Sequence, residues 1–163
     1  MTANPGVRRL ERFRVEGNSL AGWRKARNPL AVAWNFSFIQ LSRFAPSLRL
    51  KRFLLRCTGM RVDRGAAVGQ MASFDFFFPE LIELGEDCII GFNATVLSHE
   101  FLQGEWRKGR TKVGRKALVG ANSTVLAGVS VGENAVVSAM TLVNADVPDN
   151  AFAEGVPMRL RKR

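Results

Sequence analysis

The sequence is poor in the side chains that bind metal ions or form disulfides. Among its 163 residues there is a single histidine, His99, and there are two cysteines, Cys57 and Cys88, which lie far apart without CxxC spacing. Structural zinc sites and disulfide frameworks need several such side chains at short, regular spacing. We therefore expect no metal site and two free thiols, as is typical of a protein in the reducing cytoplasm.

Membrane-spanning and export segments are also missing from the pattern. Residues 29–42 (PLAVAWNFSFIQLS) are uncharged, but a bilayer-spanning helix needs about 20 apolar residues. The arginines of residues 8–14 are not followed by an apolar core and a small-residue cleavage site, so we expect no signal peptide. A cytoplasmic location follows, with peripheral contact at the inner membrane face as an open alternative.

Acidic residues are scarce in one part of the chain. Residues 1–64 carry 14 Lys or Arg and 3 Asp or Glu, whereas residues 65–163 carry 10 and 11, so the net charge of +10 belongs to the N-terminal region. Such a basic segment attracts phosphate groups without selecting a sequence. Because no nucleic-acid-binding motif accompanies it, we expect no specific nucleic-acid partner.

A repeat of six residues dominates the second half of the chain. Its leading residues are Val113, Val119, Val125, Val131, Val137 and Val143. Four positions after each valine lies a small or β-branched residue, and glycine follows the valine in three of the six units. A period of six fits neither an amphipathic helix nor a half-buried strand. It indicates stacked identical units, and therefore a parallel β-helix in which the valines point inward.

The same period appears earlier with two interruptions. The earlier leading residues are Val62, Val68 and Phe74, then Leu84, Ile90 and Val96. Residues 73–84 (SFDFFFPELIEL) span the first shift in phase, and we expect them to bulge outward. There Phe76 to Phe78 would be buried by a neighbouring chain, with the lining of a pocket as the alternative for Phe76 and Phe77. Residues 100–112 form the second interruption, which we expect to be a loop extruded from the wall. Loops on a rigid scaffold commonly carry function, and His99 lies at the base of this one.

The N-terminal region is expected to be an arm followed by two helices. Residues 1–20 lack periodicity and predict a loose arm. Asn28-Pro29 is typical of a helix start, Pro46 ends that helix, and Ser47 can cap a second one over residues 48–57. Two interpretations of the pair remain open: it caps the apolar end of the first coil, or its basic and aromatic surface binds a membrane.

The hexapeptide repeats and the Gly155-Val156-Pro157 ending resemble the left-handed β-helix acyltransferases, especially the maltose, galactoside and polysaccharide O-acetyltransferases. The resemblance covers about residues 61–163. It implies three hexads per triangular coil and a homotrimer. We accordingly divide the chain into a basic arm and helical cap (1–60), an all-β left-handed parallel β-helix with its loop (61–151) and a basic tail (152–163).

The resemblance also implies an activity. In these enzymes a histidine just before the extruded loop is the catalytic base, which corresponds to His99, and histidine is the side chain best suited to that role near neutral pH. The neutral imidazole would take a proton from an acceptor hydroxyl, whose oxygen attacks the thioester of acetyl-CoA without a covalent enzyme intermediate.

Further site residues follow from matching positions. We expect the acceptor near Asp75, Glu80, Glu100 and Trp106, with either glutamate orienting the imidazole and the tryptophan stacking on a sugar ring or on a neighbouring subunit. We expect coenzyme contacts at Ala121, Ala139, Asn144, Ala145, Arg159 and Lys162. Asn144-Ala145 replaces the family's Thr-Lys pair, and the basic tail has solvation alone as its alternative role.

Other functions compete with acetyl transfer. A carbonic anhydrase of this fold needs three histidines and is excluded by composition. A catalytically inactive β-helix scaffold, or a membrane-surface binding subunit of a polysaccharide assembly system, remains the alternative. A sugar hydroxyl, a nucleotide-sugar amine and an antibiotic all remain candidate acceptors, and the acyl group could be larger than acetyl.

Overall fold

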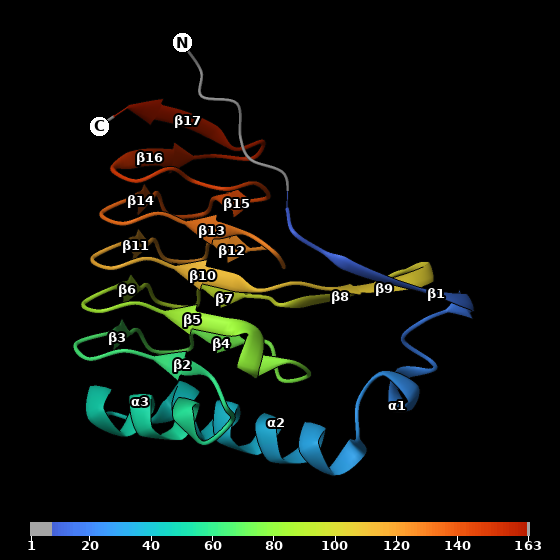
Figure 1. Ribbon diagram of the computed structural model, residues 1–163. Coiled ribbons are helices and arrows are strands. Elements are labelled where there is room, and N and C mark those ends of the chain that lie inside the picture. Colours follow the sequence, from blue (N-terminus) through green and yellow to red (C-terminus); the bar gives the residue numbers. More distant parts are fainter. Residues whose placement is uncertain (1–7, 163) are drawn as a thin grey trace.

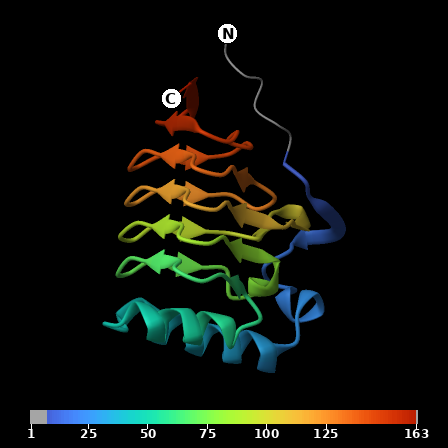
Figure 2. The same ribbon diagram turned by 60° about the vertical axis from the view of Figure 1, so that its left-hand side comes forward.

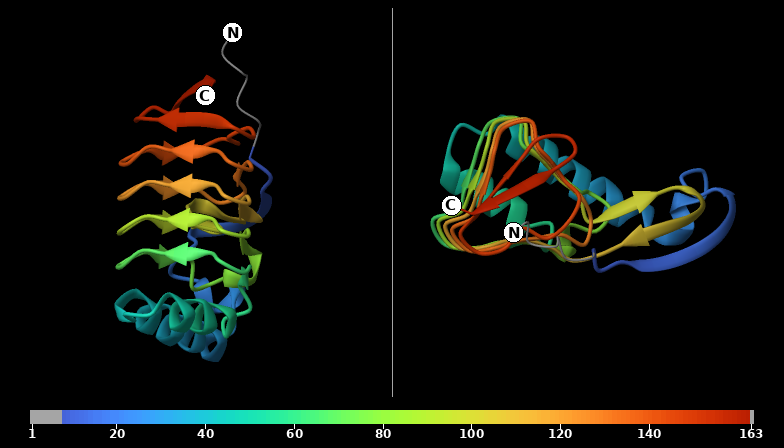
Figure 3. Two further views of the ribbon diagram at one scale, coloured as in Figure 1. Left: turned by 90° about the vertical axis from the view of Figure 1, so that its left-hand side faces the viewer. Right: turned by 90° about the horizontal axis from the view of Figure 1, so that it is seen from above.

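The structure is a computed structural model that describes residues 8–162 (Figure 1). Most of the chain winds through three parallel sheets in turn, so that each circuit makes a rung of three short strands. The rungs stack evenly when the molecule is viewed from the side (Figure 2). Seen along the stack, they superpose as a triangle with one extension at a corner (Figure 3).

Four complete rungs are followed by a closing hairpin. The rungs are β2 (Arg61–Val62), β3 (Ala67–Val68) and β4 (Ser73–Phe74); β5 (Ile82–Leu84), β6 (Ile89–Ile90) and β7 (Thr95–Val96); β10 (Thr111–Val113), β11 (Leu118–Val119) and β12 (Thr124–Val125); and β13 (Ser130–Val131), β14 (Val136–Val137) and β15 (Leu142–Val143). Strand β16 (Ala151–Glu154) continues the second sheet, and β17 (Arg159–Lys162) pairs with it in the antiparallel direction. That pairing ends the stack.

The six-residue period sets the register of the rungs. Leading residues pair with leading residues in successive rungs, as Val113 does with Leu84 below and Val131 above. These side chains are buried, and so are the small residues four positions later, such as Ala117 and Ser123. The predicted stacking of hexads and the inward direction of their leading residues are therefore confirmed.

The rungs approach each other so closely that the residue after some leading positions must be glycine. A Cβ atom on Gly91 would lie 2.6 Å from the backbone nitrogen of Ala121, and one on Gly120 would lie 2.5 Å from that of Ala139. Real Cβ atoms do not come so close to a backbone atom. The backbone of one rung thus packs directly on the glycine of the rung below.

Two helices cover the first rung. The side chain of Asn28 accepts a hydrogen bond from the backbone nitrogen of Leu30 and starts α2 (Pro29–Phe44), while that of Ser47 starts α3 (Leu48–Arg56). Both helices contribute buried side chains, including Ile39 and Leu55, to the core of the rungs. A short helix, α1 (Trp23–Ala26), precedes them. No helix within residues 8–162 combines the length and apolarity needed to cross a membrane.

A three-stranded antiparallel sheet projects from one corner of the triangle (Figures 1 and 3). It consists of β1 (Glu11–Asn18), β8 (His99–Phe101) and β9 (Gln103–Lys108), with β9 in the centre. The prediction that residues 100–112 leave the wall is confirmed, but the segment contains β8 and β9 and is not a loop throughout. The prediction of a loose arm over residues 1–20 was wrong for residues 11–18, which form β1; residues 1–7 lie outside the described residues. Each strand finds its partner at a distance in sequence, which local patterns do not reveal.

Candidate functional site

Both interruptions of the repeat lie at the same corner of the triangle. The first follows β4 and contains a short 3-10 helix, η1 (Pro79–Leu81); the second follows β7 and contains β8 and β9. Strands β4 and β7 are neighbours in one sheet, with Phe74 paired to Val96. The segments that leave these strands consequently emerge one above the other, and the residues at their bases are brought into contact.

Asp75 joins the two segments through a buried carboxylate. One of its oxygens, Oδ1, accepts hydrogen bonds from the backbone nitrogens of Phe77 (2.9 Å) and Phe78 (3.2 Å). The other, Oδ2, accepts from the backbone nitrogens of Ser98 (2.9 Å) and His99 (2.8 Å). The side chain of Asp75 is fully buried, so these bonds replace the water that a carboxylate would otherwise require.

The imidazole of His99 completes this arrangement. Its Nδ1 forms a short hydrogen bond with Oδ2 of Asp75. The side chain is 12% exposed, and its ring is surrounded by the rings of Phe77 (centroids 4.7 Å apart), Phe78 (5.7 Å) and Phe101 (4.7 Å). Since Nδ1 is engaged by the carboxylate, Nε2 is the ring nitrogen left for a substrate. A histidine held by a carboxylate in this way has the arrangement that a general base requires.

The electrostatics of Asp75 favour the ionised carboxylate. Burial alone raises the pKa of Asp75, because the charged form loses its solvation. The hydrogen bond to His99, the charge of its imidazolium form and the backbone N–H groups of Ser98 and Phe78 act in the opposite direction and prevail, so the pKa lies below its ordinary value. The carboxylate is therefore available to hold the Nδ1 proton of the imidazole.

Neither glutamate orients the imidazole, contrary to the sequence-based expectation. Glu80 forms a two-pronged ion pair with Arg27, with N–O distances of 2.7 and 3.2 Å. Glu100 pairs with Arg8 at 2.5 Å, and Arg8 also donates to the carbonyl oxygen of Ala127 at 3.0 Å. The residue with the orienting contact is Asp75, which was expected at the acceptor and whose carboxylate is instead committed to the protein. Glu80 and Glu100 tie the N-terminal region to this corner.

The phenylalanines of the first interruption are covered within the chain. Phe77 and Phe78 are buried in a cluster with Val32 of α2 and, at its edge, Trp23 and Trp106. The segment leaves the wall as expected, but these two side chains are buried within the chain and so offer no surface for the subunit contact that we expected from them. The helices and the antiparallel sheet occupy that position, which the repeat pattern alone did not indicate.

Trp106 is likewise held inside its own chain. Its ring stacks on Phe13 of β1 (centroids 4.1 Å apart) and lies parallel to Phe78 on the other side (5.6 Å). The ammonium of Lys108 lies over both phenyl rings, at 5.3 and 5.6 Å. These contacts hold the half-buried indole within its own chain, and part of it lines a cavity together with Val15 and Lys25. Stacking on a sugar or on a neighbouring subunit stays a prediction. The indole connects β1 and β9 to the aromatic rings around His99.

The expected coenzyme-binding residues are divided between different corners. Ala121 and Ala139 follow β11 and β14, at the corner where the chain enters the sheet of β4, β7, β12 and β15. His99 follows β7, at the corner where the chain leaves that sheet. Asn144 and Ala145 follow β15 and share the corner of His99, two rungs higher. Arg159, which is exposed, and Lys162 belong to β17 at the end of the stack. One chain therefore does not bring all these residues to the imidazole.

The contact between Asp75 and His99 had a signal in the sequence. Counting three hexads per rung, Phe74 and Val96 are the last leading residues of consecutive rungs, so the interruptions after them must share a corner. The contacts of Arg8 with Glu100 and Ala127 had no such signal in the sequence, because these partners lie 92 and 119 residues away.

Comparisons with known proteins match the chain to hexapeptide-repeat proteins and to acetyltransferases. Residues 110–145 match the family described as hexapeptide repeat of succinyl-transferase. YvoF of Bacillus subtilis (strain 168), a protein named as an acetyltransferase, is 42% identical over 156 residues, which cover 94% of this chain and 91% of the relative.

Solved structures resemble the fold at lower sequence identity. A maltose O-acetyltransferase from Clostridium difficile 630 gives a TM-score of 0.60 at 20% identity and covers 83% of this chain and 89% of its own. The hexapeptide-repeat acetyltransferase VCA0836 of Vibrio cholerae O1 biovar eltor, solved with acetyl-CoA, gives 0.63 at 16% identity and covers 82% and 86%. These likenesses imply that the rungs form a left-handed β-helix.

Proposed function

The chain belongs to the hexapeptide-repeat acetyltransferase family, and we propose that it transfers an acetyl group from acetyl-CoA to a hydroxyl group of a sugar or glycan precursor. The acetyl donor is supported by the structural neighbour bound to acetyl-CoA. The acceptor class is supported by the likeness to a maltose O-acetyltransferase.

The observation that carries the proposal is the pairing of Asp75 with His99. A buried carboxylate that accepts four backbone N–H groups and an imidazole nitrogen holds the ring in one orientation and one tautomer. The proton of that tautomer resides on Nδ1, so Nε2 carries the lone pair. A neutral imidazole presented in this way is suited to remove a proton from a hydroxyl group.

The reaction follows in two steps. Nε2 of His99 accepts the acceptor's hydroxyl proton as that oxygen bonds to the thioester carbonyl carbon, which gives a tetrahedral oxyanion and an imidazolium. The C–S bond then breaks, the carbonyl reforms, and the imidazolium returns the proton to the departing coenzyme sulfur. Asp75 stabilises the imidazolium between these steps through its adjacent negative charge. The products are an acetyl ester and coenzyme A, and His99 is regenerated.

We further propose that the working form is a homotrimer. The support is the separation of the candidate residues: Ala121 and Ala139 lie at a different corner from His99. A neighbouring copy packed against the sheet of β4, β7, β12 and β15 would bring its own alanine corner toward this imidazole, and closed symmetry would repeat the arrangement. Analytical ultracentrifugation should give three times the monomer mass, and a monomer at micromolar concentration would contradict the proposal.

The test of function is a screen for coenzyme A release by the purified protein. Acetyl-CoA is supplied with mono- and disaccharides, amino sugars and nucleotide sugars, and the product is identified by mass. We expect a gain of one acetyl group, removed by mild alkali because it is an ester. A product stable to alkali would indicate an amide and would replace the hydroxyl acceptor by an amine.

Absence of coenzyme A binding would contradict the proposal as a whole. Calorimetric titration with coenzyme A measures this without an acceptor, and it separates an enzyme whose acceptor is missing from the screen from an inactive scaffold. Binding without turnover on the panel would reject the sugar class while retaining acetyl transfer.

A further inference from the structure

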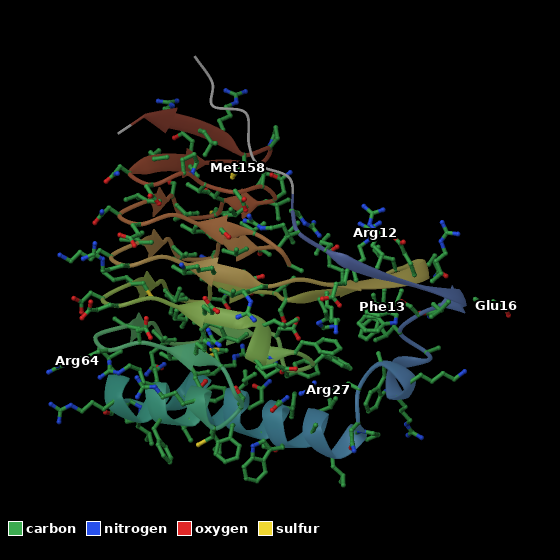
Figure 4. All side chains as sticks on the ribbon, viewed as in Figure 1. Arg12, Phe13, Glu16, Arg27, Arg64 and Met158 are labelled. Atoms are coloured by element: carbon green, nitrogen blue, oxygen red, sulfur yellow. The ribbon has the colours of Figure 1, made fainter. Side chains whose placement is uncertain are left out.

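Helices α2 and α3 present an unusual surface on the side that faces away from the rungs, which we call the base face. Figure 4 shows side chains projecting from it below both helices, and Figures 2 and 3 place the two helices side by side at that end of the stack. Its large apolar residues, all exposed, are Leu30, Trp34, Leu41, Phe44, Leu50 and Phe53.

Helix α2 carries large apolar residues on both sides, unlike an ordinary surface helix: Val32 and Ile39 are buried toward the protein, and further apolar residues are exposed on the outer side. Its side toward the protein includes Asn35 and Ser42, both buried, whose side chains donate to the carbonyl oxygens of Phe76 (3.1 Å) and Ile39 (2.8 Å). Its outer side includes Leu30, 80% exposed, and Phe44, 66% exposed. A helix bounded by water normally places such side chains the other way, and contiguous exposed apolar residues mark a contact surface.

The same region has one sign of charge. Between Glu16 and Asp63 the sequence has no aspartate or glutamate and nine basic residues. These are Arg24, Lys25, Arg27, Arg43, Arg49, Lys51, Arg52, Arg56 and Arg61. Three of them add no free charge to the surface, because Arg27 and Arg61 pair with Glu80 and Glu83 and Lys51 is buried. Arg49 and Arg56 are exposed on α3, where Arg56 also donates to the carbonyl oxygen of Val62, and exposed Arg64 adds to them near α3 (Figure 4). An apolar centre with a cationic rim is therefore the character of this surface.

This charge decides between two kinds of occupant. A second copy docked base to base would bring cations against cations without a carboxylate to neutralise them, which opposes association. A surface of anionic lipid offers phosphates to the arginines and an acyl boundary to the aromatic rings. Trp34 is suited to such a boundary, because its ring is apolar and its Nε1 is already satisfied by the carbonyl oxygen of Cys57 at 3.0 Å.

We propose that the base face docks on an anionic lipid bilayer, with α2 and α3 lying in the headgroup region and the rungs standing away from it. The apolar side chains supply the insertion, and the arginines supply attraction to the lipid phosphates. The proposal does not depend on catalysis, since no residue of the base face belongs to the corner that holds His99.

Vesicle sedimentation with matched variants tests the surface. The full-length protein should pellet with phosphatidylcholine vesicles that contain phosphatidylglycerol, and more weakly with phosphatidylcholine alone or at high salt. The variant Phe44→Ser/Phe53→Ser should bind the anionic vesicles about 10-fold more weakly or less still. The control Phe92→Ser removes a phenyl ring of similar exposure, 55% against 61% for Phe53, from a corner of the second rung; it should bind like the wild type.

Fluorescence tests the depth of insertion independently. Lipids with brominated acyl chains should quench Trp34, which is 56% exposed on the base face. Trp106 should be spared because Phe13 and Phe78 cover its ring. The variant Trp34→Phe should therefore remove most of the quenching while circular dichroism remains unchanged.

Three results would overturn the proposal. Undiminished binding of Phe44→Ser/Phe53→Ser, with loss of binding only when Arg49 and Arg56 are replaced by glutamine, would mean that a basic protein merely adsorbs to negative charge. A smaller mass of the phenylalanine variant in ultracentrifugation would show that a second copy covers the base face. Quenching that persists in Trp34→Phe would place another surface on the lipid. If Phe44→Ser/Phe53→Ser does not fold, the quenching result decides alone.

Discussion

The two rungs formed by β10 to β15, here called the upper rungs, differ from the interrupted corner in how they satisfy buried groups. In the upper rungs, every turn repeats the same contacts between leading aliphatic residues and glycines, and the polar groups of the strands pair with the rungs above and below. At the corner that follows β4 and β7, buried backbone N–H groups are instead satisfied by the carboxylate of Asp75. Three phenyl rings surround the imidazole that this carboxylate holds.

The difference shows how a repetitive fold acquires a site. A strict repeat buries its apolar row evenly and leaves no side chain in a special position. Two insertions at one corner displace the chain outward in consecutive rungs, and the residues at their bases become neighbours at a fixed distance. The upper rungs then supply rigidity, while the chemistry is concentrated where the repeat fails.

The largest effect is expected for His99→Ala, which should lower turnover without lowering stability. The imidazole belongs to the corner and not to the interior of the rungs, so the variant should remain folded and should keep its affinity for coenzyme A. Loss of a general base should lower turnover by ~10²–10⁴-fold. Turnover and coenzyme A affinity are to be measured on one preparation. Retained turnover would remove His99 from the mechanism, and loss of folding would assign it a structural role.

Asp75→Asn should come next. The amide cannot satisfy all the N–H groups that face the carboxylate, and it does not hold the proton on Nδ1 of His99. We expect a fall in kcat of about 10²-fold together with a loss of roughly 2–3 kcal/mol in the free energy of unfolding. Unfolding in urea and steady-state kinetics check the two effects. An unchanged kcat would show that the contact with His99 does not matter for catalysis.

The pH dependence of unfolding gives Asp75 a second test. Its folded-state pKa lies below the ordinary value of 3.8, so the unfolded chain binds the proton more readily. The stabilisation is therefore complete above that value and is lost as the pH falls through the folded-state pKa. The Asp75→Asn variant should not show this loss of stability at acid pH, because it has no carboxylate at that position. Parallel pH profiles for the two proteins would contradict this assignment.

A substitution in the upper rungs should have the complementary effect. Val119→Ala removes two methyl groups from a fully buried position and should lower the free energy of unfolding by about 2 kcal/mol. Because its rung carries no insertion, kcat should remain within about twofold of the wild type at temperatures where the variant is folded. A large fall in kcat with normal folding would show that the corner depends on the packing of the upper rungs more closely than the comparison suggests.

The smallest effect is expected at the outer edge of the corner. Phe13→Ala removes the ring that covers Trp106 and should cost about 1 kcal/mol, mainly by loosening β1 from β9. We expect a modest rise in KM for the acceptor with little change in kcat, and increased exposure of Trp106 to the aqueous quencher acrylamide. Phe92→Ser, on a regular rung corner, is the matched control and should leave this quenching as it is.

The sequence by itself determined the repeating part of the protein and its most reactive side chain. The hexads from Val62 to Val143 predicted the inward residues and the stacked strands, because each unit meets a neighbour with the same pattern and the information is local. The capping signals at Asn28 and Ser47 predicted the helices for the same reason. His99 was singled out by its position at the base of an interruption.

Only the tertiary structure decided what surrounds that histidine. The hexads place Asp75 and His99 at one corner, but only the fold shows that the carboxylate binds the imidazole. Arg8 reaches Glu100 across 92 residues, and Phe13, near the N-terminus, covers Trp106. Such contacts depend on how the insertions and the N-terminal strand fold back on one corner. The local sequence around each residue does not predict these contacts, because the partner lies far away in the chain and is brought near only by folding.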